Sequence, residues 1–465
     1  MGAIIAVLNK RGKNATETAV AMLKMLEHKG IEASGIASPT IVKIEKSIEA
    51  LQNQNVNSPV VIGQTFSKTL PLDKPQPTKL ENTTLVFEGK VYPAPAEISG
   101  AEIVARKLQQ NHEENIKFLM KKIEGEFAFA SAKSQRLVAG RDTMGIRPLY
   151  YGENTDYVAL ASERKALWKI GMKTVNSFPP GHLAFIDKHG FKFKLVKTLV
   201  RSRARKITMQ VAAKKLQKLL QKSTRERVSR LKEVAVAFSG GLDSSIIAFL
   251  AKKSGVDIHL VHVSLENQPE TEHAQNAAEK LKLPIHVYLY HEEDVEKVLP
   301  KVLWLIEEPD PLKTSIGIPI CWTAEKAAEM NFKVILAGQG ADELFGGYKR
   351  YIYDYSRYGS ENVRNRIFKD IVRMFEVNFE RDFKICNYHN VELRLPFATY
   401  QMAKFAADLP VELKIETKGD GLRKLVLRQA AENLGIPQSI VRKPKKAIQY
   451  ATGINKTLKK LAARK

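Results

Sequence analysis

The stretch VAVAFSGGLDSS, residues 234–245, decides the fold of the larger part of this chain. Its first five residues are apolar and predict a buried strand, and the residues after Leu242 predict a helix. Glycines between them let the backbone approach a ligand, and hydroxyl and N–H groups at a helix start favour an anion. No lysine follows the glycines, so this is not the GxxxxGK[ST] loop. The predicted phosphate site consists of Ser239, Gly240, Gly241, Asp243, Ser244 and Ser245.

Apolar segments alternate with helical segments after this loop, which predicts a parallel sheet covered by helices on both faces. The last of these segments, FKVILAG, runs into GQGADELFGGY, residues 338–348, a second loop rich in glycine and acidic residues. The carboxyl ends of parallel strands converge on one crevice, so we expect Asp243 and Asp342 to lie together. With phosphate oxygens they form a candidate Mg²⁺ site. The tail from about residue 365 is predicted to be mostly helical.

Residues 1–195 have a different character, since short apolar runs alternate with turn residues. This spacing predicts layered, mainly antiparallel sheets, with helices at 15–30 and 100–112. The basic, unpatterned stretch near residues 196–208 is the predicted boundary between domains 1–195 and 208–465. The fold class is therefore α+β followed by α/β, with a doubly wound parallel sheet and a helical tail.

The chain has 74 Lys and Arg against 50 Asp and Glu, a net charge of +24. These cations are scattered along amphipathic helices with little aromatic interleaving, which favours solvated faces and small anions over nucleic acid. No apolar run of about 18 residues and no secretory signal is present, so no membrane association is expected. Cys321 and Cys386 lack a close cysteine partner, which fits a reducing cytoplasm.

Several motifs resemble those of asparagine synthetases, in the same order and at similar spacing. SGGLDSS, GQGADELFGGY, VELRLPF (391–397) and RKPKKAIQYATG (442–453) are similar to the synthetase domain of that family. RDTMGIRPLYYG (141–152), ASERKAL (161–167) and FPPGHLAFID (178–187) resemble its amino-terminal glutaminase domain, which has an Ntn-hydrolase-like fold. The chain is identified as a member of this family over nearly its whole length.

The resemblance implies a ligase that uses ATP and Mg²⁺ to adenylate the aspartate β-carboxylate, releasing pyrophosphate before nitrogen attacks the adenylate. The implied catalytic residues are Asp243, Asp342 and Lys445, with Lys446 as an alternative because the register there is ambiguous. Val263, Gly338 and Gly340 join the phosphate loop as implied nucleotide contacts. The implied acid-binding residues are Lys313, Ser315, Gln339 and Glu343.

The glutaminase parts of the family are changed together in this chain. Its nucleophilic cysteine is replaced by Gly2, which has no reactive side chain. Glu88 stands where the family has an oxyanion-hole asparagine, and a carboxylate repels a developing oxyanion. Thr65 and Gly100 stand for the arginine and the acidic residue that hold glutamine. The chain is therefore expected to use free ammonia and to lack glutaminase activity.

Two departures leave the acid substrate open. Gln339 replaces a glutamate that is a candidate base for ammonia, and Leu312, Lys313 and Ser315 replace threonines and an arginine near the aspartate. The alternatives are an amide ligase for another acid or amine, similar to β-lactam synthetases, a non-catalytic regulatory paralogue, and an RNA-modifying enzyme. The intact acidic loops disfavour the paralogue, and the lack of an RNA-binding module disfavours the last. A homodimer and an external ammonia source are also left open.

Overall fold

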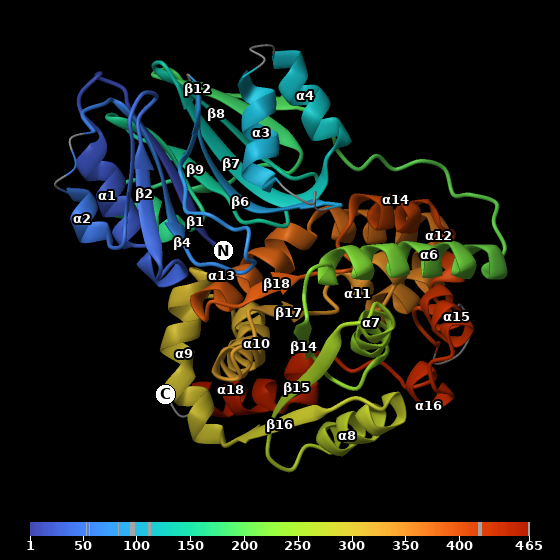
Figure 1. Cartoon of the computed structure of the whole chain (residues 1–465). Helices are drawn as coiled ribbons and strands as arrows, with labels where there is room; N and C mark the ends of the chain where they lie inside the picture. Colours follow the sequence, from blue (N-terminus) through green and yellow to red (C-terminus); the bar gives the residue numbers. More distant parts are fainter. Residues whose placement is uncertain are drawn as a thin grey trace. The chain divides into compact units, whose positions relative to one another are not determined.

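The computed structural model describes the chain except for residues 53, 55, 82, 94–97, 110–112, 417–420 and 464–465. The described residues form two compact units, Met1–Thr198 and Leu199–Lys465 (Figure 1). Residues 196–208 contain neither helix nor strand. Each unit is considered separately below.

The first unit contains two antiparallel sheets within its described residues. One has the order β11 (Asn176–Ser177), β9 (Tyr150–Glu153), β10 (Tyr157–Ala161), β1 (Gly2–Asn9), β4 (Val60–Phe66), β2 (Ala33–Ala37), β3 (Val42–Glu45). The other has the order β13 (Gly190–Leu195), β12 (His182–Asp187), β8 (Arg136–Arg141), β7 (Glu124–Lys133), β6 (Thr83–Tyr92), β5 (Thr78–Leu80). The layered antiparallel fold expected from the sequence is confirmed.

Strand β1 is buried on both of its faces, which explains its unbroken apolar sequence. Ile4, Ala6 and Leu8 pack in one core with residues of β6 and β7, so this core lies between the two sheets. The alternate residues Ala3 and Ile5 pack with helices on the outer face of the first sheet. These helices are α1 (Thr16–Lys24), α2 (Ile48–Gln52) and α5 (Arg164–Lys169).

The outer face of the second sheet is covered by α3 (Gly100–Gln109), and α4 (Glu113–Lys122) packs there as well. The unit thus has four layers, helix, sheet, sheet and helix. A single turn of 3₁₀-helix, η1 (Glu27–Lys29), follows α1. Of the two expected helical segments, 15–30 holds α1 and η1, and 100–112 begins with α3, while its last residues, 110–112, lie outside the described chain.

The second unit is built on a parallel sheet with the order β16 (Ile285–Tyr290), β15 (Asp257–Leu265), β14 (Glu233–Ala237), β17 (Val334–Leu336), β18 (Glu392–Arg394). All four strand pairs are parallel. The strand order reverses between β14 and β17, and such switch points are where open α/β sheets bind ligands. Helices α7 (Leu242–Lys253) and α10 (Pro311–Glu329) lie on opposite faces of this sheet (Figure 1). The doubly wound parallel sheet is confirmed.

The remaining described helices complete both faces of the sheet and the tail. They are α6 (Met209–Val228), α8 (Pro269–Leu281), α9 (Glu292–Ile306), α11 (Ala341–Phe345), α12 (Lys349–Val372), the π-helix η2 (Phe375–Phe379), α13 (Glu380–Tyr388), α14 (Tyr400–Asp408), the 3₁₀-helix η3 (Val411–Leu413), α15 (Leu425–Leu434), α16 (Gln438–Val441), α17 (Ile448–Ala451) and α18 (Ile454–Ala462). None of the described helices combines the length and the apolar composition of a membrane span.

The tail differs from the expectation in one respect, because the strand β18 interrupts its helices and forms an edge of the parallel sheet. This strand has only three residues, too few for an alternating pattern to stand out. Its side chains are all buried, including those of Glu392 and Arg394, which pair with each other at 2.7 Å. This strand was not predicted from the sequence, because two of its three residues are charged although all three are buried.

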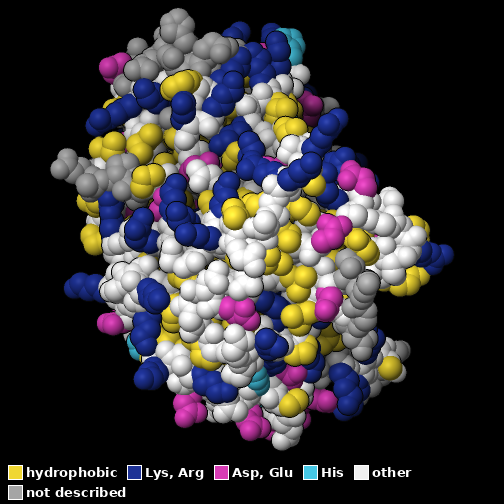
Figure 2. Space-filling model, turned by 90° about the vertical axis from the view of Figure 1, so that its right-hand side faces the viewer, with side chains coloured by type: hydrophobic (Ala, Val, Ile, Leu, Met, Phe, Trp, Pro, Cys, Tyr) yellow, Lys and Arg dark blue, Asp and Glu magenta, His cyan; other side chains and the backbone are white. Residues whose placement is uncertain are grey.

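The positive charge of the protein is distributed rather than gathered. On the face drawn in Figure 2, Lys and Arg side chains are spread over the surface, with Asp and Glu side chains between them. This arrangement agrees with solvated faces and provides no continuous basic stripe on that face.

A buried ionic cluster ties η1 to the start of α5 in the first unit. Glu163, whose side chain is fully buried, lies 3.1 Å from the Lys29 ammonium and 2.7 Å from that of Lys165. His28 Nε2 lies 3.2 Å from the same carboxylate. Burial by itself raises the pKa of Glu163, but Lys29, Lys165 and His28 outweigh it and lower this pKa well below its usual value.

We predict that Glu163→Gln lowers the free energy of unfolding by about 3–5 kcal/mol, because it removes a buried carboxylate that pairs with the ammonium groups of Lys29 and Lys165. The carboxylate's contribution is complete above the unfolded-state pKa of about 4.3 and is lost as the pH falls towards the depressed folded-state pKa. The free energy of unfolding of the variant should therefore fall less steeply than that of the wild type as the pH is lowered. The measurement is chemical denaturation followed by circular dichroism between neutral and acid pH.

The matched control is Glu153→Gln, which removes a carboxylate that is 49% exposed and pairs with Lys10 at 2.7 Å. Because this pair is largely solvated, the control should lose about 1 kcal/mol or less. Equal losses in the two variants would show that the buried cluster contributes no more than a surface ion pair.

Candidate active site

The phosphate loop leaves the end of β14 and enters α7, as its sequence predicts. Gly240 has a φ of +68°, and a Cβ atom there would lie 2.7 Å from the Ala274 Cα atom of α8, so only glycine fits. The Gly241 N–H donates to Ser239 Oγ at 3.3 Å, and Ser244 Oγ donates to the Gly241 carbonyl oxygen at 3.3 Å. The serines therefore hold the loop against the amino terminus of α7, where helix N–H groups favour an anion.

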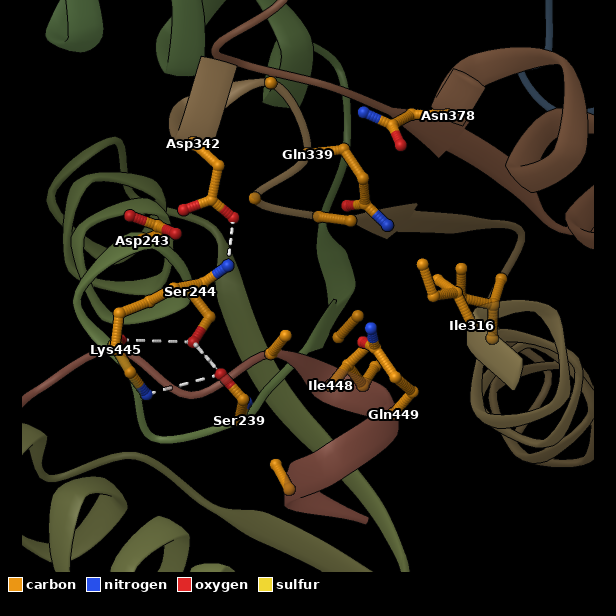
Figure 3. Close-up of a pocket in the computed structure, with 18 of the residues that line it drawn as sticks. Ser239, Asp243, Ser244, Ile316, Gln339, Asp342, Asn378, Lys445, Ile448 and Gln449 are labelled. Atoms are coloured by element: carbon orange, nitrogen blue, oxygen red, sulfur yellow. Dashed lines mark hydrogen bonds and ion pairs between the residues drawn. The ribbon is translucent and has the colours of Figure 1, made fainter. Parts of the chain in front are cut away.

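The second loop leaves the neighbouring strand β17 and passes directly beside the first. A Cβ atom on Gly338 would lie 2.9 Å from the Cβ atom of Asp243, so the two loops are in close contact at this glycine. Asp342 lies in the first turn of α11, immediately beyond. The switch point thus brings Asp243 and Asp342 together, as Figure 3 shows.

Two lysines hold this pair of carboxylates. The ammonium of Lys424 lies 2.5 Å from Asp243 Oδ2 and 2.8 Å from Asp342 Oδ1, so it bridges both acids. Lys445 donates to Asp342 Oδ2, and its ammonium lies 5.4 Å from the centre of the Tyr348 ring. Lys446, the alternative to Lys445, instead pairs with Glu270 at 2.5 Å and is 44% exposed.

The two lysines have unequal effects on the pKa values of Asp243 and Asp342. Burial raises the pKa of Asp243, even though Lys424 opposes this shift. Burial also acts to raise the pKa of Asp342, but Lys424 and Lys445 together lower it far below its usual value. Asp342 is therefore ionised at neutral pH, and Asp243 is the acid whose charge is least compensated by the protein.

The residues present fit a hard divalent cation beside phosphate groups. Asp243 Oδ1 is shielded from solvent and has no hydrogen-bond donor among the described residues, although it belongs to a carboxylate that is 21% exposed on the cavity side. Mg²⁺ is held by one or two carboxylates and by phosphate oxygens rather than by a full protein cage. In agreement with this, the described side chains form no cluster of three or more His, Cys, Asp or Glu that could hold a metal alone.

A cavity of about 520 Å³ opens beside these loops. It reaches from the phosphate loop to α10 and to residues around η2, and α17 closes it on another side (Figure 3). Most residues predicted from the sequence line it, namely Ser239, Gly241, Asp243, Ser244, Val263, Gly338, Gln339, Gly340, Asp342, Glu343 and Lys445.

Four predicted residues do not belong to the described lining of this cavity. Gly240 and Ser245 lie behind the phosphate loop, where Gly240 packs against α8 and Ser245 is fully buried. Lys313 pairs with Glu308, and Ser315 Oγ donates back to the Leu312 carbonyl oxygen at 2.9 Å. The structure therefore does not bring Lys313 and Ser315 to the place where the sequence prediction needs them.

The other two acid-binding candidates face the cavity with their polar atoms engaged. Glu343 accepts hydrogen bonds from Tyr348 Oη and, at 2.7 Å, from Asn378 Nδ2. Burial and the charge of Asp342 raise the pKa of Glu343. The Gln339 side chain hydrogen-bonds Asp382 and acts to lower its pKa, although burial raises that pKa overall. Gln339 is thus a neutral donor and not a base.

Lys424 is the important residue that sequence analysis missed. It precedes α15 with a φ of +60°, a conformation rarely adopted by residues other than glycine. Its side chain is 2% exposed and therefore committed to the two acids. Neither spacing nor composition marks it, because the contact joins residues 424 and 243, which lie far apart in the chain. The sequence offers one weak signal, which is that Lys424 and Arg428 stand among apolar residues.

In the first unit, the positions that replace the glutaminase residues are filled by the protein itself. A Cβ atom on Gly2 would lie 1.7 Å from the carbonyl oxygen of Thr65, so no side chain fits there. The Thr65 hydroxyl accepts a hydrogen bond from the Ala3 N–H at 3.1 Å. The buried Glu88 carboxylate accepts one from Ser162 Oγ at 2.7 Å. A Cβ atom on Gly100 would lie 2.9 Å from the Phe87 ring.

A parallel α/β sheet whose switch point carries an anion loop and two carboxylates is typical of a nucleotide-binding domain. The asparagine synthase family model matches residues 215–362 and 358–465, and the glutamine amidotransferase domain model matches residues 73–169. The chain belongs to the asparagine synthase family, which is a family of ATP-dependent amide ligases.

Individual relatives agree with this assignment. A Methanocaldococcus jannaschii protein that carries the name of a glutamine-hydrolysing asparagine synthetase is 29% identical, over 99% of this chain and 95% of its own length. Asparagine synthetase B of Escherichia coli is 26% identical over 73% of this chain, and asparagine synthetase 2 of Arabidopsis thaliana is 26% identical over 77%. The chain spans only 64% and 62% of the length of these last two relatives.

We predict that Lys445→Ala lowers kcat for ATP turnover by about 10²-fold. The Lys445 ammonium lies beside Asp342, where we expect it to stabilise the negative charge that develops on a leaving pyrophosphate. The KM for ATP should change by less than about threefold, since a group that acts in the transition state affects kcat. The measurement is ATP–pyrophosphate exchange in the presence of a panel of carboxylic acids.

Lys446→Ala is the matched control, because this neighbouring ammonium pairs with the partly exposed Glu270 and not with Asp342. It should leave kcat within about threefold of the wild-type value. If the larger defect instead belongs to Lys446→Ala, the assignment of Lys445 is wrong by one residue.

Proposed function

We propose that this protein is an AMP-forming amide ligase that activates a carboxylic acid with ATP and transfers free ammonia to it. The observation that carries the proposal is the convergence of Asp243 and Asp342 beside the SGGLDSS loop, with Lys445 on Asp342. Aspartate is the acid that the family resemblance implies and is the first candidate to test. The site residues predicted from the sequence keep their roles as part of this proposal, apart from Lys313 and Ser315.

The first step is adenylation of the acid. A carboxylate oxygen attacks the α-phosphorus of ATP, the bond from that phosphorus to the bridging oxygen breaks, and pyrophosphate leaves. The N–H groups at the start of α7 and the serine hydroxyls bind the pyrophosphate, and Lys445 stabilises its growing charge. Asp243 and Asp342 would hold Mg²⁺, which neutralises phosphate charge when bound.

The second step forms the amide. The ammonia nitrogen attacks the acyl carbon, the bond from that carbon to the phosphate oxygen breaks, and AMP leaves with its electron pair. The nitrogen must lose a proton in this step. The Gln339 side chain cannot accept this proton. Glu343, whose pKa is raised, is the one carboxylate among the predicted substrate residues and is the proposed acceptor.

The two domains have different roles in this proposal. We assign residues 1–195 to a glutaminase-like domain without glutaminase chemistry and residues 208–465 to the synthetase domain. The replacement of the nucleophile by Gly2 and the filling of its space by the Thr65 carbonyl group support the first assignment. The nitrogen donor is therefore ammonia from solution or from another enzyme.

We predict that ammonium and not glutamine supports AMP formation, with a rate that rises with pH because neutral ammonia is the attacking species. Loss of one oxyanion donor alone costs about 10²- to 10³-fold, and here the nucleophile is absent as well. The measurement is glutamate release from glutamine by the purified chain, with and without ATP and acid. Stoichiometric glutamate release alongside product would contradict the proposal.

Two variants serve as controls. Gly2→Cys should not restore glutamate release, because its side chain would collide with the Thr65 carbonyl group. Asp243→Asn should abolish ATP–pyrophosphate exchange while leaving the circular dichroism spectrum unchanged, because it removes the least compensated charge of the site. Exchange at the wild-type rate by Asp243→Asn would remove this site from the reaction.

A further inference from the structure

The wall of the cavity formed by α10 is apolar except for Thr323, whose hydroxyl donates to the Pro319 carbonyl oxygen at 2.7 Å. Leu312, Ile316, Ile320 and Ala324 all line the cavity, and their spacing of four residues places them on one face of this helix. Leu312 is 53% exposed, so its surface is available to a ligand. Figure 3 shows Ile316 across the cavity from Asp243 and Asp342.

The apolar wall continues where α12 passes into η2. Met374 and Val377 line the cavity there, and Val377 is 37% exposed. A π-helix such as η2 occurs frequently at functional sites, since its wide turn moves side chains away from their α-helical positions. Two separate elements thus present aliphatic side chains to the end of the cavity that lies away from the phosphate loop.

The charged groups near this wall already have partners. Arg350 pairs with Asp370 at 2.7 Å, Arg373 with Glu376 at 3.3 Å and Arg381 with Asp382 at 2.6 Å. Lys313 pairs with Glu308, Ser315 Oγ donates to the Leu312 carbonyl oxygen, and neither residue belongs to the described lining of the cavity. Glu343 Oε1 accepts hydrogen bonds from both Tyr348 Oη and Asn378 Nδ2.

An amino acid substrate would therefore bind poorly at the α10 wall. Its α-carboxylate and α-ammonium groups would lose water against Leu312 and Ile316 and would have to compete with existing ion pairs for partners. Burying an ionised group without a partner is strongly unfavourable. An apolar chain in the same place gains about 0.8 kcal/mol for each methylene removed from water.

We infer that the acid activated by this enzyme carries an apolar tail, aliphatic or aromatic, and is not aspartate or another α-amino acid. This inference rests on the proposed function and names the class of its substrate. The carboxylate of the acid lies towards Lys445 and the phosphate loop, and its tail lies along Leu312, Ile316, Ile320, Met374 and Val377.

Binding of acyl-sulfamoyl adenosines, stable analogues of the acyl-adenylate, tests this inference without turnover. We expect the hexanoyl analogue to bind at least about tenfold more tightly than the acetyl and aspartyl analogues in calorimetry with the full chain. In ATP–pyrophosphate exchange, kcat/KM should be at least about tenfold higher with hexanoate than with aspartate.

Ile316→Asn places a polar group in the apolar wall and should lower the affinity for the hexanoyl analogue by about tenfold or more, with little effect on the affinity for AMP. Val211→Asn is the matched control, because this aliphatic side chain is 57% exposed on α6 and does not line the cavity. It should leave both affinities unchanged. AMP binding also reports whether either variant has failed to fold.

The outcomes separate the two proposals. Tighter binding of the aspartyl analogue, or faster exchange with aspartate, would overturn the apolar-acid inference and leave the amide ligase in place. Equal effects of Ile316→Asn and Val211→Asn would remove the α10 wall from acid recognition. Exchange with none of the acids in the panel would overturn the proposed function and this inference with it.

Discussion

The second unit depends on the placement of two carboxylates at one point of a sheet. Asp243 and Asp342 come from adjacent loops, and like charges at this separation would drive the loops apart if nothing compensated them. Lys424 bridges both acids at 2.5 and 2.8 Å, and this contact ties the start of α15 to α7 and α11. The strained backbone of Lys424 shows that the surrounding structure holds this lysine in place. The placement of Asp243 and Asp342 therefore depends on three features together. These are the switch point of the sheet, the glycines of both loops and the carboxy-terminal helices.

The first unit keeps the layered fold although the residues at the expected glutaminase positions differ from those of the family. The β1 strand still occupies the centre of a sheet with both faces buried, as a catalytic terminus of the family requires. The space beside Gly2, however, is taken by the Thr65 carbonyl group, and Glu88 is turned inward to Ser162. Core packing and the cluster around Glu163 preserve the layers independently of any active site. The stability of this unit thus does not depend on the family's residues at the former glutaminase positions.

Local motifs explain why much of the second unit could be predicted from the sequence. The SGGLDSS and GQGADELFGGY loops follow apolar strands directly, so the convergence of Asp243 and Asp342 follows from the rule for parallel sheets. Lys424 could not be predicted, because its contacts join distant parts of the chain. Lys313 and Ser315 were predicted only as acid-binding residues, and the sequence did not indicate that the cavity side of α10 is formed by residues 312, 316 and 320. The strand β18 was hidden by its buried ion pair.

The π-helix η2 has a consequence for how this family diverges. A π-turn holds one residue more than an α-turn, so deleting a single residue between 375 and 379 would restore ordinary α-helical geometry there. The flanking helical turns would keep their phase, because the π-turn already accommodates the extra residue, so the side chains of the turn itself, Val377 among them, would change direction relative to the cavity. A one-codon insertion or deletion can therefore remodel the lining of this cavity in one evolutionary event, while the phosphate loop and its two carboxylates stay as they are.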